Sequence, residues 1–116
     1  MDEQVDVARA YLRALRSHNG NSVPIEPRAV RYEAGLKTAF SGDHLRRSLS
    51  RGPQYRLIEA IRDCVWSVDG DDVTADYLLD AGLLGRTLVT VRVVETFRIP
   101  RDDLRIHRID AKIRRP

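Results

Sequence analysis

Apolar residues recur at helical spacing in the first part of the chain. Residues 3–17 place them on one stripe with arginines on the other side, which predicts an amphipathic helix. Asp2 is a suitable N-cap for this helix, and the "HNG" of residues 18–20 is a typical stop signal. The apolar stripe consists of Val5, Ala8, Tyr11, Leu12 and Leu15, and the arginines are Arg9, Arg13 and Arg16.

A second, shorter helix is predicted over residues 41–53, where Leu45 and Leu49 face inward. Ser41 or Asp43 caps its start, and a Gly-Pro pair marks its end.

The segment between the two helices contains two prolines and several turn-forming residues. Residues 21–30 are therefore predicted as an irregular connector. Residues 29–35, "AVRYEAG", are predicted as a short strand or a bend.

From residue 54 onwards, polar and apolar residues alternate with the period of two that is typical of β-strands. Turn-forming stretches such as the "DGDD" of residues 69–72 divide this region into hairpins. The predicted strands are residues 54–68, 73–82, 86–99 and 104–114. Helices followed by hairpin-linked strands predict an α+β fold, with the helices on one face of an antiparallel sheet.

Length and composition predict one soluble domain, residues 1–116. A chain of this size can bury a core without cross-links. No apolar run is long enough to span a membrane, so no membrane partner is expected. The single cysteine, Cys64, excludes an intramolecular disulfide and agrees with a reducing compartment. We therefore expect a cytoplasmic protein.

The charge pattern argues against a nucleic-acid partner. The net charge is +3, and the arginines are scattered among acidic residues rather than clustered with aromatic ones. The three histidines and the cysteine lie far apart, without the spacing of a metal site. We expect neither a metal nor an organic cofactor. Cys64, two residues before Trp66, is predicted to be a packed thiol rather than a nucleophile.

The strand predicted at residues 86–99 carries an acidic residue on its apolar face. Glu95 shares that face with Val89, Val91, Val93 and Phe97. A carboxyl group buried without a partner has a raised pKa, and it can then donate a proton or a hydrogen bond. Glu95 is therefore a candidate catalytic acid, a ligand-binding group, or part of a structural polar network with an arginine or Tyr11.

Four segments give the chain a resemblance to a known superfamily. The order of the elements, with "YLRAL", "AVRYEAG", "SGDHLRRSL" and "VETFRIPRDDLRIHRI", is similar to the nuclear transport factor 2-like superfamily. Within it, the SnoaL-like and ketosteroid-isomerase-like branches are the most similar, and the resemblance covers nearly the whole chain. It implies a cone in which a curved antiparallel sheet wraps the N-terminal helix, with a pocket at the open end. It also implies a homodimer packed through the sheets.

The resemblance also implies site residues. In ketosteroid isomerases, a tyrosine on the first helix and a protonated acid on a strand bind the developing enolate oxygen, and another carboxylate moves the proton. Tyr11 and Glu95 fall at the first two positions, and Glu33 falls near the third. Two such donors aimed at an oxyanion each contribute about 3–4 kcal/mol to the transition state. The other residues expected to line the pocket are Trp66, Tyr77, Val93, Phe97 and His107.

Two functions remain open at this point. The chain is either an enzyme that uses acid–base chemistry on a small apolar carbonyl or polyketide-like compound, or a non-catalytic ligand-binding or dimerisation module. Glu33 separates them, since a carboxylate facing the pocket favours the enzyme and a solvent-exposed one favours binding. Tyr11 as a core residue and His107 as a core or rim residue are the structural alternatives. A related limonene-epoxide-hydrolase-like branch has an acid where this chain has Ala111, which argues against an epoxide hydrolase.

The outer face of the strand at residues 86–99 is mixed in character. Thr90, Val94 and Thr96 surround Arg92 on it, with Leu88 near one end. This face is apolar enough to be covered by the sheet of a partner, which agrees with the expected homodimer.

Overall fold

The computed structural model describes residues 2–51 and 58–116. The first helix, α1 (Glu3–Ser17), has the predicted bounds and cap. Asp2 Oδ1 accepts a hydrogen bond from the backbone N–H of Gln4 at 2.8 Å, and the helix ends where His18 adopts φ 58°.

A short 3-10 turn, η1 (Gly20–Ser22), follows the first helix, and the second helix, α2 (Gly42–Arg51), comes after the first two strands. Ser41 caps it, since its Oγ accepts a hydrogen bond from the N–H of His44 at 3.1 Å. Leu45 and Leu49 are fully buried, as predicted. The last residues of the predicted helix, 52 and 53, lie outside the described residues.

The strands form one mixed, mostly antiparallel sheet with the order β2-β1-β6-β5-β4-β3. Neighbouring strands are antiparallel except β1 and β6, which are parallel. The strands are β1 (Ile25–Glu33), β2 (Leu36–Ala39), β3 (Ile58–Asp69), β4 (Asp72–Leu83), β5 (Arg86–Arg98) and β6 (Ile106–Arg114). The predicted α+β class is confirmed, with the correction that one strand pair is parallel. Residues 54–57 of the predicted third strand lie outside the described residues.

The prediction of an irregular connector over residues 21–30 is wrong, because β1 begins at Ile25. Its prolines concealed the strand, since proline cannot donate to a sheet ladder. The pairing of β1 with β6 shifts register between Ile25 and Val30, and Pro27 lies within this irregular stretch. A strand can therefore hold a proline here.

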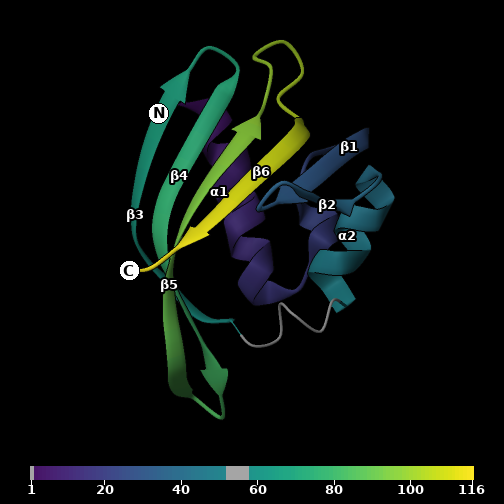
Figure 1. Ribbon diagram of the computed structural model, residues 1–116. Coiled ribbons are helices and arrows are strands. Elements are labelled where there is room, and N and C mark those ends of the chain that lie inside the picture. Colours follow the sequence, from purple (N-terminus) through teal and green to yellow (C-terminus); the bar gives the residue numbers. More distant parts are fainter. Residues whose placement is uncertain (1, 52–57) are drawn as a thin grey trace.

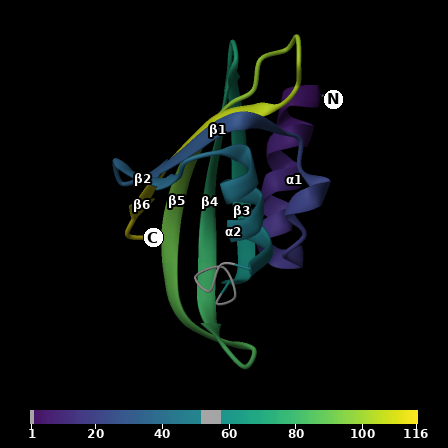
Figure 2. The ribbon, with the colours of Figure 1, turned by 90° about the vertical axis from the view of Figure 1, so that its right-hand side faces the viewer.

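Both helices cover the same face of the curved sheet (Figure 1), and α1 lies beside the edge strand β3 (Figure 2). The core between these layers contains Tyr11, Tyr77 and Phe97, each almost or fully inaccessible to solvent. No helix in the described part of the chain is long and apolar enough to cross a membrane. The architecture is the predicted cone, with a sheet wrapped around the N-terminal helix.

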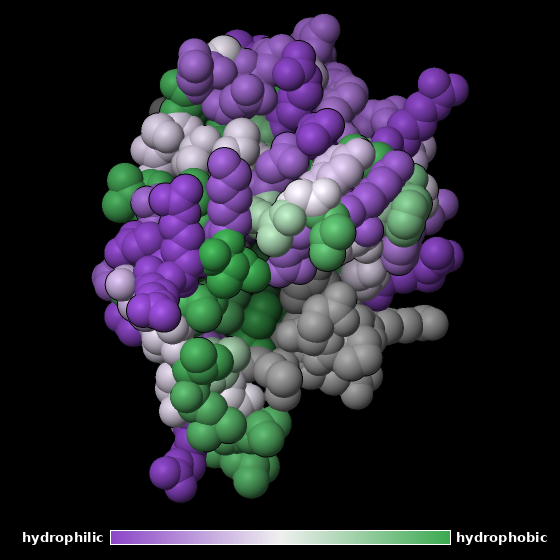
Figure 3. Space-filling model, in the orientation of Figure 1, coloured by the Kyte–Doolittle hydropathy of each residue, from purple (hydrophilic) through white to green (hydrophobic). Residues whose placement is uncertain are grey.

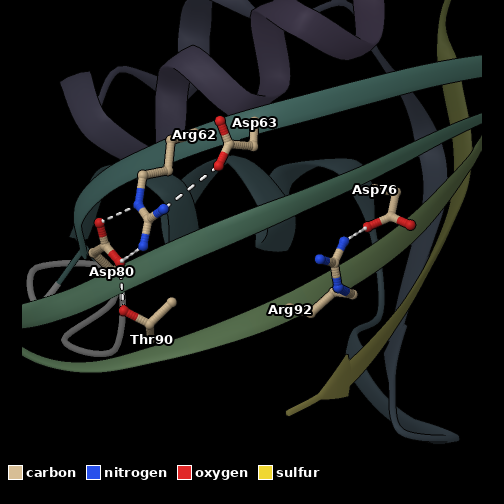
Figure 4. A network of polar contacts seen from close by, with 6 residues as sticks. All are labelled: Arg62, Asp63, Asp76, Asp80, Thr90 and Arg92. Atoms are coloured by element: carbon tan, nitrogen blue, oxygen red, sulfur yellow. Dashed lines mark hydrogen bonds and ion pairs between the residues drawn. The ribbon is translucent and has the colours of Figure 1, made fainter. Parts of the chain in front are cut away.

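The outer face of the sheet, opposite the helices, carries a network of ion pairs (Figure 4). Arg62 binds Asp80 at 2.9 Å, and Thr90 donates a second hydrogen bond to Asp80 at 2.6 Å. These hydrogen bonds, that from Arg62 foremost, lower the pKa of Asp80. A separate ion pair joins Arg92 to Asp76 at 2.6 Å. The predicted outward orientation of Thr90 and Arg92 is therefore confirmed.

Candidate functional site

A cavity of about 180 Å³ lies between the inner face of the sheet and the C-terminal half of α1. Among the described residues that form its walls, only Arg31 and Glu33, both from β1, are charged or polar. Exposed leucines at the β4–β5 hairpin extend the apolar surface on this side of the molecule (Figure 3). The described lining residues are Leu15, Arg31, Glu33, Ile58, Leu79, Ala81, Val91, Val93, Ala111 and Ile113.

Arg31 lies between two carboxyl groups, those of Glu33 and Glu95, and contacts both. Its Nη1 lies 3.5 Å from Glu33 Oε2 and donates a hydrogen bond to Thr38 Oγ1 at 3.0 Å. Its Nη2 lies 3.6 Å from Oε2 of the buried Glu95. Arg31 is only 7% exposed, whereas the Glu33 side chain is 38% exposed. The guanidinium is thus held between one carboxyl group in the core and another at the cavity.

Glu95 is buried on the inner face, as the alternation predicted, with 1% of its surface exposed. Tyr77 donates a hydrogen bond to its Oε1 at 2.7 Å. The strand pairing explains this contact: Ala75 lies opposite Glu95, and Tyr77 is the next inward residue of β4. Because alanine is small, the tyrosine hydroxyl has room to reach the carboxyl group diagonally.

Burial sets the protonation of this pair. Burial raises the pKa of Glu95, and the neighbouring Arg31 and the hydrogen bond from Tyr77 oppose that rise only in part. Burial, followed by the neighbouring Glu95, also raises the pKa of Tyr77 far above its ordinary value. The Tyr77 hydroxyl therefore stays protonated and remains a donor across the physiological pH range.

The structure does not bring all the predicted site residues into one cavity. Tyr11 and Phe97 are fully buried and pack edge to face, with ring centroids 5.3 Å apart. Together with Tyr77 and Glu95, they form the core beside the cavity rather than its described lining. Of the predicted residues, only Glu33 and Val93 are among those described as lining the cavity.

Two predicted residues lie away from this cavity. Trp66 lines a separate groove between α1 and β3. His107 lies at the start of β6, where its Nε2 contacts Asp103 Oδ2 in the β5–β6 connection. Both residues lie on the strands predicted for them. The alternation of polar and apolar residues indicates the face of a strand, but not how far along the sheet a residue lies from the cavity.

Arg31 is the site residue that the sequence analysis missed. The signal was present, because Arg31 and Glu33 alternate onto one face of "AVRYEAG" once that segment is read as a strand. Parallel pairing with β6 then places Arg31 opposite Ile109 and Glu33 opposite Ala111, so both point to the inner face. Among the described residues, no group of three His, Cys, Asp or Glu side chains is arranged to hold a metal ion.

Comparison with solved structures identifies the fold. An epoxide hydrolase of the limonene-epoxide-hydrolase-like type from M. tuberculosis superposes with a TM-score of 0.74 at 18% identity, covering 96% of this chain and 82% of that one. A hypothetical protein with a ketosteroid isomerase-like fold from Catenulispora acidiphila, in complex with trimethylamine, gives 0.71 at 14% identity, covering 90% and 82%. A putative SnoaL-like polyketide cyclase from Shewanella denitrificans gives 0.67 at 15% identity, covering 95% and 89%.

These similarities confirm the predicted nuclear transport factor 2-like fold, with SnoaL-like and ketosteroid-isomerase-like structural neighbours. At such low identities they establish the fold and not the chemistry. No curated protein matches the sequence. A family model matches residues 1–113, and the chain therefore belongs to the family described as Domain of unknown function (DUF8021).

Proposed function

We propose that the cavity binds a small, mostly apolar carbonyl compound and that Glu33 and Arg31 carry out acid–base chemistry on it. The observation that carries this proposal is the single charged wall of the cavity. Arg31 and Glu33 lie side by side on β1, and the rest of the described lining is apolar. A ligand with one polar end and an apolar body fits this distribution.

The volume limits the size of the ligand. An apolar cavity of about 150 Å³ accommodates benzene. The cavity of about 180 Å³ therefore suits a single ring or a short branched chain. A four-ring steroid is too large for the space that the described residues enclose, so we propose a smaller substrate than that of the ketosteroid isomerases.

The proposed reaction is proton abstraction from the carbon next to the carbonyl group. The Glu33 carboxylate accepts the proton and the electron pair of the C–H bond moves into an enolate. The Arg31 guanidinium stabilises the negative charge on the enolate oxygen. Return of the proton to the same carbon gives exchange. In a substrate with a carbon–carbon double bond one carbon further on, the proton returns instead to the far end of the dienolate, so that the double bond moves and no further reactant is needed.

In this proposal Glu95 and Tyr77 are positioning residues. Glu95 lies 3.6 Å from the Arg31 guanidinium, and Tyr77 fixes the carboxyl group by a hydrogen bond. They act on the ligand only through Arg31, which differs from the direct roles that the resemblance implied for Tyr11 and Glu95. A buried acid with a raised pKa leaves more of the positive charge of Arg31 available to the ligand.

Ligand binding without catalysis is the second candidate. It is favoured by the position of Tyr11, Tyr77 and Glu95 in the core, outside the described lining of the cavity. In that case Arg31 would bind a polar ligand group, and Glu33 would only orient Arg31. Both candidates require an occupied cavity.

Binding is tested by titrating the protein with cyclohexanone while observing methyl groups by NMR. We expect the methyl signals of Leu79, Val91 and Val93 to shift and those of the distant core residue Val73 to stay. Ala81→Leu should fill the cavity and abolish the shifts. Its matched control is Ala60→Leu, which adds the same side chain on the opposite face of the sheet. Ala60 lies opposite Asp80 in the strand pairing, and Asp80 forms its ion pair with Arg62 on the outer face. Unchanged cavity signals, or shifts that persist in Ala81→Leu, would contradict the proposal.

We also propose that the protein forms a homodimer through the outer face of its sheet. Val65 and Leu88 are each 68% exposed on the sheet strands, and Val65 pairs with Asp76, which belongs to the ion pairs of the outer face (Figure 4). Apolar side chains interspersed with charges of both signs suit a self-complementary contact.

A further inference from the structure

A groove of about 480 Å³ separates α1 from the edge strand β3. The described residues that line it include Leu12, Ile61 and Trp66 on its apolar part and Arg9, Arg13 and Arg16 on its charged part. None of its described lining residues belongs to the cavity at Arg31 and Glu33. It is therefore a separate candidate site.

The three arginines form a concentrated positive charge. They follow one another at i, i+4 and i+7, so they share one face of α1. Asp6 pairs with Arg9 at 3.3 Å in an exposed contact. In the described part of the chain, Arg13 and Arg16 have no carboxylate within ion-pair distance. By contrast, Arg62 and Arg92 on the outer face are each neutralised by an aspartate.

Like charges on neighbouring turns of a helix repel one another and destabilise the helix. An anion held between the guanidinium groups would remove that repulsion, and guanidinium groups are suited to phosphate and carboxylate. The charged part of the groove is therefore complementary to an anionic group.

The apolar part of the groove is aromatic. Trp66 is half-buried, and the Arg9 guanidinium lies over its ring at 5.5 Å from the centroid. Leu12 and Ile61 add aliphatic surface on the two sides of the groove. Planar rings pack well against such surfaces, and the volume of the groove is ample for one ring with an anionic substituent.

We propose that this groove binds a small aromatic anion, with the anionic group at Arg13 and Arg16 and the ring against Leu12, Ile61 and Trp66. An inorganic anion would use only the charged part, and a neutral aromatic compound only the apolar part. The ligand therefore needs both features to bind well.

Trp66 provides a direct reporter, because it is the only tryptophan in the chain. The experiment is a titration of the full chain with phenyl phosphate, followed by the fluorescence of Trp66 and by the NMR signal of its indole N–H. Inorganic phosphate and phenol are titrated in parallel. We expect saturable binding of phenyl phosphate, and weaker binding of the other two by about tenfold or more.

The decisive variant is Arg13→Gln/Arg16→Gln, and its matched control is Arg105→Gln/Arg115→Gln. Arg105 and Arg115 are also exposed, and the control removes the same charge. We expect the first variant to weaken phenyl phosphate binding by about tenfold and the control to leave it unchanged. Circular dichroism verifies that both variants are folded. No binding, equal loss in both variants, or inorganic phosphate binding as tightly as phenyl phosphate would overturn the proposal.

Discussion

The hydroxyl group of Tyr77 donates a hydrogen bond to the buried carboxyl group of Glu95 across 2.7 Å, between two adjacent strands. This contact holds a titratable group in the core directly beneath the charged wall of the cavity. Through Arg31, it connects the core to the carboxylate of Glu33.

Tyr77→Phe should destabilise the protein by about 1–3 kcal/mol. The variant removes the hydroxyl group, so the buried Oε1 atom of Glu95 loses the hydrogen bond that it accepts. Chemical denaturation followed by circular dichroism measures this change. Tyr32→Phe is the matched control, since Tyr32 is only partly buried. Equal stability of the Tyr77 variant and the wild type would show that the hydrogen bond contributes little.

Removing the charge of Glu95 should change the pH dependence of stability. The pKa of the folded group is raised above its ordinary value of 4.5. Above that pH the unfolded chain has released the proton and the folded protein still binds it. The free energy of unfolding should therefore fall as the pH rises from 4.5 to the folded pKa. Glu95→Gln should lack this fall.

At neutral pH, Glu95→Gln should be tolerated or mildly stabilising, since the amide keeps an acceptor for Tyr77 and is never charged. Glu95→Ala should cost about 1–3 kcal/mol, because it leaves the buried Tyr77 hydroxyl without its acceptor. Identical pH profiles of the wild type and Glu95→Gln would contradict the raised pKa, as would an NMR titration of the Glu95 carboxyl carbon at the ordinary value.

Much of the fold was predictable, because it depends on local patterns. Helix α1 has a complete apolar stripe with a capping aspartate, and the burial of Glu95 follows from its phase with Val93 and Phe97. An arginine beside Glu95 was expected and is found in Arg31, but the hydrogen bond from Tyr77 was not predicted, because it depends on the register of β4 against β5. Register is set by long-range packing and not by the local sequence.

The cavity wall was harder to predict. Pro27 made the start of β1 look irregular, and residues 29–35 alone fit a strand or a bend equally well, so the face on which Arg31 lies stayed undetermined. The parallel pairing of β1 with β6 joins segments that are far apart in the chain, and local patterns do not indicate which strands will be neighbours. The resemblance located Glu33 near the site, but the ion pair between Arg31 and Glu33 became visible only in the structure.

Gly42, at the start of α2, has no room for a larger residue. A Cβ atom on Gly42 would come within 2.5 Å of the Glu26 carbonyl oxygen, which belongs to the backbone of β1. Gly42→Ala should therefore destabilise the protein by about 1–3 kcal/mol despite the better helix propensity of alanine. Arg47→Ala, at an exposed position of the same helix, is the control for propensity. A more stable Gly42→Ala variant would show that α2 and β1 are not packed this closely.

The proposed homodimer should be visible by light scattering at micromolar protein concentration, with a mass of twice 13.2 kDa. Leu88→Lys should weaken it, because a charged side chain in the contact would lose its water. Leu84→Lys is the control, since Leu84 is fully exposed at the hairpin turn. A monomer whose mass does not change with concentration would refute this assembly.

The central claim, proton abstraction in the cavity, is tested by deuterium exchange into cyclohexanone. The protein is incubated with the ketone in heavy water, and NMR follows the loss of hydrogen next to the carbonyl group. We expect exchange faster than in buffer, a loss of about 100-fold or more of this acceleration in Glu33→Gln, and retained binding in the same variant. Exchange at the buffer rate despite binding would show a ligand-binding module, and equal acceleration by Glu33→Gln would exclude Glu33 as the base.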